Sequence, residues 1–129
     1  MEELLYSYTE GYYFLLDYSP SHSEMVIRKR DNAVKHNVDL FFKAVCNIHL
    51  TVKLNGIKVF KVYRQDDLLP FPNPAKRTEL YKITDNGGYI GYVDASVFVV
   101  FHNSLDILET SLGDFTWSDR NREVFSTTI

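Results

Sequence analysis

The sequence predicts an all-β fold, a single-domain antiparallel β-sandwich or flattened barrel of about seven to nine strands. The first observation is composition, since nine Tyr and nine Phe are residues that suit a pleated, half-buried surface. The second is an alternation of apolar and polar residues, clearest over 38–54, with the period of a strand. The third is a set of short turn signals between apolar segments. With 129 residues, 45% of them hydrophobic, we expect 1–129 to form one domain.

The segment Val38–Leu54 has the clearest strand pattern, because every even position in it is apolar. It exceeds the usual strand length of about 3 to 10 residues, so we expect a bulge or a bend within it. Asn55-Gly56 follows directly and is typical of a two-residue hairpin turn. Such a turn would pair Leu54 with Ile57 and lead into a return strand at 57–64.

A second hairpin is predicted around Asn86-Gly87, between strands at 78–84 and 89–101, and this turn would place Ile83 opposite Ile90. Residues 97–101 are all apolar. A strand of this kind is expected in the middle of a sheet, covered on both faces.

The remaining elements follow from shorter patterns. Strands are expected at 12–18 and 25–29, on either side of a turn at 19–22, and another at 105–112. Residues 1–7 suit either a strand or a short helix. From about residue 119 the chain is polar, which predicts a mobile tail unless Val124-Phe125 docks on the domain.

No catalytic or metal-binding pattern is found. The four histidines lack metal-ligand spacing, and no nucleophile, phosphate-loop or zinc motif occurs. The single cysteine, Cys46, cannot form an internal disulfide, and its place on the apolar side of 38–54 predicts a buried, unreactive thiol. We therefore expect a protein that is not an enzyme and has no cofactor and no metal.

Charge is unevenly distributed along the chain, although the net charge is only −3. Residues 1–20 carry four acids and no base, residues 21–64 carry nine bases against three acids, and residues 78–129 carry three bases against eight acids. Either these segments neutralise one another across strands, or the basic segment forms a positive face for an acidic partner. The basic cluster at 28–30 lacks interleaved exposed aromatics, so nucleic acid is not an expected partner.

No apolar run is long enough to span a membrane, and the first residues lack the pattern of a signal peptide. We therefore expect a cytoplasmic protein that does not contact a membrane. Segments such as 37–42 and 54–57 are typical of small bacterial β-proteins in general and identify no family.

The proline-rich loop at 65–77 is one candidate binding site, because loops present side chains without disturbing a sheet. In this hypothesis Leu69 and Phe71 are apolar anchors, and Asp66 and Asp67 steer a basic partner at the rim. The alternative is a loop that only covers one end of the sheet.

The tyrosines near the N-terminus are a second candidate site, with Tyr12 and Tyr13 as partner-binding residues. Tyrosine is rigid and amphipathic and is common at interfaces. Acids accompany these rings in the sequence, which again suits a basic partner. The alternative is that the rings cover an edge of the sandwich.

Together these features predict a small, soluble, non-catalytic protein that binds another protein, for example of the immunity or inhibitor type. Two alternatives stay open: a carrier with an apolar, aromatic-lined cavity for a small ligand, and an enzyme without a recognisable motif. The partner's identity and the oligomeric state are not determined by the sequence.

Overall fold

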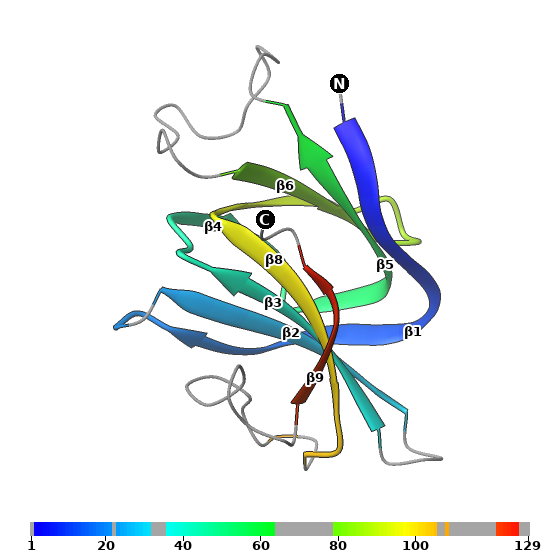
Figure 1. Cartoon of the computed structure of the whole chain (residues 1–129). Coiled ribbons are helices and arrows are strands. Elements are labelled where there is room, and N and C mark those ends of the chain that lie inside the picture. Colours follow the sequence, from blue (N-terminus) through cyan, green and yellow to red (C-terminus); the bar gives the residue numbers. More distant parts are fainter. Residues whose placement is uncertain are drawn as a thin grey trace.

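The computed structural model describes residues 2–21, 23–31, 36–63, 79–105, 108 and 121–126. These residues form nine β-strands in one antiparallel sheet (Figure 1). The strands are β1 (Glu2–Ser19), β2 (Glu24–Asp31), β3 (His36–Lys43), β4 (Asn47–His49), β5 (Lys53–Val62), β6 (Glu79–Thr84), β7 (Ile90–Ala95), β8 (Val97–Asn103) and β9 (Asn121–Ser126). The predicted all-β fold is confirmed. The described part of the chain has no helix long and apolar enough to cross a membrane.

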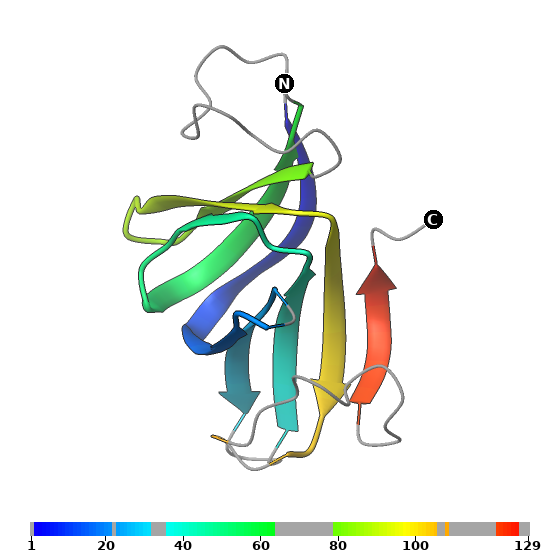
Figure 2. The same ribbon diagram turned by 90° about the vertical axis from the view of Figure 1, so that its left-hand side faces the viewer.

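The sheet is folded over on itself, as Figure 2 shows. Its strands follow the order β4-β7-β6-β5-β1-β2-β3-β8-β9. The long strand β1 joins the two halves, because it pairs with β5 over Glu2–Phe14 and with β2 over Phe14–Ser19. The two halves are connected a second time between β7 and β8, which are separated only by Ser96. The end strands β4 and β9 do not pair with each other, so the result is a flattened, open barrel.

The core lies between the two halves. Three aromatic rings meet at its centre: Phe42 from β3, Tyr81 from β6 and Phe98 from β8, with ring centroids 5.0 to 5.9 Å apart. Aromatic pairs in this range stabilise a core beyond the area that they bury. The outer face of β2, β3 and β8 holds a second buried cluster, formed by Val26, Phe41, Val99 and Phe101. The prediction that 97–101 is covered on both faces is therefore confirmed.

The segment 38–54 is bent, as expected, but the bend changes which residues face the core. β3 ends at Lys43, and Ala44 has a φ of 53°. Val45 is then buried and Cys46 is exposed, so the prediction of a buried Cys46 is wrong. The reason is that a residue in the left-handed region interrupts the two-residue alternation of a strand.

The hairpin predicted at Asn55-Gly56 is also wrong. β5 continues through these residues without reversing, with Leu54 opposite Tyr13 and Ile57 opposite Tyr8. Gly56 does adopt the positive φ that the motif suggested, at 69°. Its positive φ bends β5 at a corner of the β1–β5 pair. The chain does not reverse at this point, because β1 and β6 already occupy the two edges of β5.

The hairpin at Asn86-Gly87 is confirmed, with a register one residue away from the expected one: Ile83 lies opposite Gly91. The cause is the longer loop, in which Asp85 Oδ1 accepts hydrogen bonds from the backbone of Gly87 and Tyr89. These bonds hold the pKa of Asp85 below its ordinary value, against a desolvation that raises it.

The first and the last segments that the structure describes are strands. Residues 1–7 had suited a strand or a helix, and Glu2–Ser7 belong to β1. The strands expected at 12–18 and 25–29 form the β1–β2 hairpin. Within the expected polar tail, Asn121–Ser126 form β9 and pair with β8. Most of the strand expected at 105–112 lies outside the described residues.

Candidate functional site

The sequence-predicted site residues fall into two groups. Asp66, Asp67, Leu69 and Phe71 lie outside the described residues. Tyr12 and Tyr13 are neighbours on β1, so their side chains project to opposite faces. Tyr12 is 56% exposed, whereas Tyr13 is completely buried in the core. Only Tyr12 is placed where a partner could touch it.

Tyr13 has a structural role. Its hydroxyl lies 2.7 Å from that of Tyr6, and the two rings meet edge to face. Burial, followed by the hydrogen bond with Tyr6, raises the pKa of Tyr13 far above its ordinary value. A hydroxyl that must stay neutral inside the fold links stability to alkaline pH.

We expect Tyr13→Phe to flatten the loss of stability at high pH. In the wild type the neutral Tyr13 contributes its full stabilisation below the unfolded-state pKa of about 10. Above that value the unfolded chain releases the proton more easily, and stability falls by up to about 1.4 kcal/mol per pH unit. Urea unfolding between pH 8 and 11 measures the slope. The control is Tyr18→Phe, which removes a hydroxyl from an exposed ring. Equal slopes in all three proteins would contradict the prediction.

The candidate site is the exposed edge of β1. Every residue from Ser7 to Tyr12 is exposed, whereas a strand inside a sheet normally alternates between buried and exposed residues. β1 pairs with β2 only from Phe14 onward. In the part of the chain that the structure describes, the edge of Glu2–Tyr12 that faces away from β5 therefore has no strand beside it (Figure 1).

Two glycines and one turn shape this edge. The β1–β5 pairing is interrupted between Tyr8 and Tyr12, where Gly11 on β1 has a φ of 79° and Gly56 on β5 a φ of 69°. Asn86, in the β6–β7 turn, donates from its side chain to Thr9 O at 2.7 Å and from its backbone to Asn55 O at 2.8 Å. The turn thus replaces ladder hydrogen bonds at the corner and holds Ser7–Tyr12 in place.

Lysines accompany the exposed tyrosines of this stretch. Lys29 Nζ, from β2, lies 4.5 Å from the centroid of the Tyr8 ring, and Lys53 Nζ, from β5, lies 4.5 Å from that of Tyr12. Lys58, on β5, is exposed and lies opposite Ser7. We call Ser7–Tyr12 with these three lysines the β1 edge.

The acids of the N-terminal segment contribute less to this surface than the sequence suggested. Glu2 forms an ion pair with Lys82, and Glu3 accepts a hydrogen bond from the Tyr63 hydroxyl. Glu10 remains at the β1 edge, where it helps to line a shallow hollow of about 380 Å³ with Ser7, Tyr8 and Thr9. The surface is therefore one of tyrosine and lysine rather than one of tyrosine and acid.

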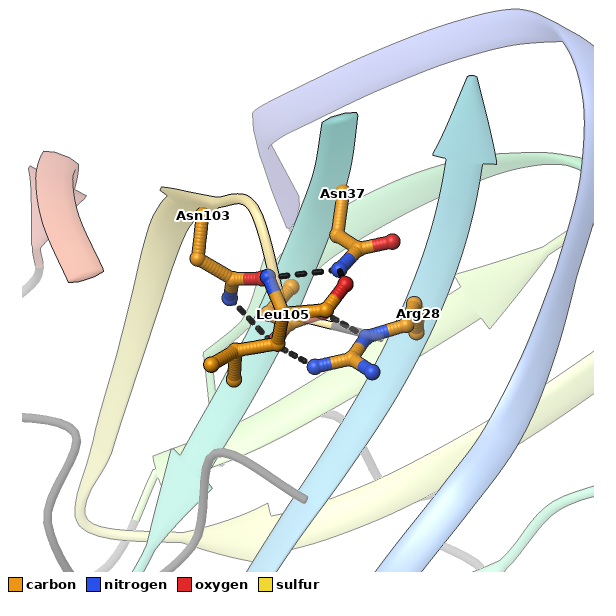
Figure 3. A network of polar contacts seen from close by, with 5 residues as sticks. Arg28, Asn37, Asn103 and Leu105 are labelled. Carbon is orange, nitrogen blue, oxygen red and sulfur yellow. Dashed lines mark hydrogen bonds and ion pairs between the residues drawn. The ribbon is translucent and has the colours of Figure 1, made fainter. Parts of the chain in front are cut away.

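A buried polar network lies on the outer face of β2, β3 and β8 (Figure 3). Arg28 donates from Nε and Nη2 to the two carboxylate oxygens of Asp39, at 2.7 and 2.9 Å. Asn103 Nδ2 donates to Asp39 Oδ2 at 2.7 Å, and Asn37 Nδ2 donates to Asn103 Oδ1 and to Leu105 O. All four side chains are buried. The network therefore links three strands and offers no charge to the surface.

The sequence analysis did not predict this network and treated Arg28 only as part of the basic cluster at 28–30. The one available signal was an acid, Asp39, within a strongly apolar strand. Its partner is identified only by the register that places Arg28 opposite Asp39.

Among the described residues, no group of three or more His, Cys, Asp or Glu could hold a metal ion. The rings of Phe42, Tyr81 and Phe98 pack against one another in the core. Among the described residues, the β1 edge is therefore our candidate binding site. Comparisons with protein-family models, with curated proteins and with solved structures find no match to this chain.

Proposed function

We propose that this protein is a non-catalytic binding protein, and that it recognises an extended segment of another protein by adding it as a strand to the β1 edge. The observation that carries the proposal is the run of exposed residues Ser7–Tyr12 on a strand whose second edge is free among the described strands. Free backbone donors and acceptors on such an edge are a template for another strand.

Long exposed edges are usually blocked, because they invite aggregation. Charged side chains, bulges and short strands are the common means. Here β1 has a bulge and nearby lysines, but it also exposes Leu4, Tyr8 and Tyr12. Exposed aromatic rings beside open backbone groups are what a binding strand offers: hydrogen bonds for affinity and side chains for selectivity.

The direction of one backbone group at this edge follows from the ladder. Phe14 lies opposite Lys53, and Leu15 N donates to Val52 O at 2.8 Å. Because antiparallel residues alternate in the side to which their backbone groups point, the N–H of Tyr12 points away from β5. No described strand is paired with β1 at Tyr12 on that side, so we expect an added strand to accept a hydrogen bond from this N–H.

The test starts from a random peptide library selected against the folded protein. We expect the selected peptides to slow hydrogen exchange at the β1 amides between Ser7 and Tyr12. Tyr12→Pro, which removes the free donor, should abolish binding, whereas Tyr12→Ala should only weaken it. Thermal unfolding checks that both variants fold. If Tyr12→Pro does not fold, the weaker binding of Tyr12→Ala and the hydrogen-exchange data still test the proposal. Protection confined to β4 or β9 would contradict the proposal.

The mode of binding fits the inhibitor type expected from size and charge. Strand addition needs no catalytic group and no cofactor, only a rigid edge. The edge is rigid because the β6–β7 turn is hydrogen-bonded to it through Asn86, and a preorganised edge loses little conformational entropy on binding.

A further inference from the structure

Three lysines surround the exposed stretch Ser7–Tyr12 from both sides. Lys29 approaches from β2, and Lys53 and Lys58 from β5. All three belong to the basic segment 21–64 of the sequence. The structure thus gathers part of that segment's charge at the β1 edge, while another of its cations, Arg28, is neutralised by Asp39 in the interior.

None of these three lysines has an acidic partner among the described residues. Lys61 and Lys82 differ, since they form ion pairs with Glu79 and Glu2. Glu10 is the one acid within Ser7–Tyr12, and one carboxylate cannot neutralise three ammonium groups. The β1 edge therefore has an excess of positive charge, in a chain whose net charge is −3.

Lys29 is held in a defined position rather than left free in solvent. An added Cβ at Gly11 would lie 2.9 Å from Lys29 Cε, so the aliphatic chain of the lysine occupies the space that a side chain at residue 11 would need. The ammonium group rests on the Tyr8 ring. The ring attracts the cation through its face and leaves other N–H donors of the ammonium open to an anion.

We infer that the segment recognised at the β1 edge is acidic, with carboxylates spaced along an extended chain. This inference rests on the proposed function and names the chemistry of its partner. In an added strand, alternate side chains lie on one face about 6.4 to 6.8 Å apart, so one extended chain can present several carboxylates along the β1 edge. The inference differs from the basic partner predicted from Asp66 and Asp67, which lie outside the described residues.

Three synthetic peptides test it. They share one alternating, strand-forming pattern and carry glutamate, glutamine or lysine at every second position. We expect the glutamate peptide to bind best, the lysine peptide worst, and the preference for glutamate to fall as salt is added. In Lys29→Gln/Lys53→Gln, affinity for the glutamate peptide should fall about 3- to 10-fold, as expected for two exposed ion pairs, with little change for the glutamine peptide.

The control is Lys61→Gln/Lys82→Gln, which makes the same change in net charge at lysines that already have acidic partners. It should leave the preference for glutamate in place. Equal affinity for all three peptides, with protection of the β1 amides, would overturn the acidic partner and leave the proposed function standing. Tighter binding of the lysine peptide would also overturn it. If these peptides and the selected library peptides all leave the β1 amides unprotected, the proposed function itself fails.

Discussion

Asp39→Ala is expected to lower the free energy of unfolding by about 3–5 kcal/mol, because it removes one partner of a buried ion pair. Arg28 and Asp39 are both fully buried and joined by two hydrogen bonds of 2.7 and 2.9 Å. Without the carboxylate, the guanidinium loses its ion pair and two hydrogen bonds with Asp39, and Asn103 loses one acceptor of its amide. Urea unfolding monitored by circular dichroism measures the loss.

Two further variants make this prediction specific. Glu79→Ala removes a carboxylate from the exposed ion pair with Lys61 and should cost less than about 1 kcal/mol. Arg28→Met/Asp39→Leu removes both charges of the pair and should be more stable than Asp39→Ala alone, since the Arg28 guanidinium is then no longer buried without the Asp39 carboxylate. If Asp39→Ala costs no more than Glu79→Ala, the network does not stabilise the fold as described.

Gly56→Ala should lower stability by about 2–3 kcal/mol, through backbone strain and a steric clash at the corner of β5. Gly56 has a φ of 69°, which costs an L-residue about 1–2 kcal/mol. An added Cβ would also lie 2.9 Å from Thr9 O and 2.6 Å from Asn86 Nδ2. The clash therefore falls on the turn that holds the β1 edge.

Gly88→Ala is the matched control, because Gly88 has a φ of 87° and no atom within 4 Å of an added Cβ. Gly88→Ala therefore has the conformational cost alone, about 1–2 kcal/mol. The difference between the two variants in thermal or urea unfolding isolates the clash. Equal losses would show that the corner relaxes freely, and that Asn86 does not fix the position of Thr9.

The predictions of a buried Cys46 and of a hairpin at Asn55-Gly56 failed for one physical cause. The even-position alternation over 38–54 was real, but Ala44 adopts a left-handed conformation and moves the pattern by one residue, which exposes Cys46. Asn55-Gly56 was taken as a turn because it permits positive φ, yet the same property serves a bend within β5. Local sequence indicates where the backbone can bend, while neighbouring strands decide whether the chain reverses there.

The candidate site was only partly predictable. Exposed tyrosines near the N-terminus were expected, and Tyr12 is one of them, but Tyr13 proved to be buried. Nothing in the sequence placed Lys29 and Lys53 on the rings of Tyr8 and Tyr12, because those contacts join three different strands. Nor could the sequence tell that Arg28 belongs to the interior.

The sequence by itself determined the fold class, the single apolar run covered on both faces, and the β6–β7 and β1–β2 hairpins, because period-two patterns and turn chemistry are local properties. The tertiary structure alone decided the order of the strands, the free edge of β1, and the partners of the buried and exposed charges. These depend on which distant strands lie side by side. A single shift of register changes the face or the neighbour of every side chain on a strand. No local pattern in the sequence determines which strands pair or in which register.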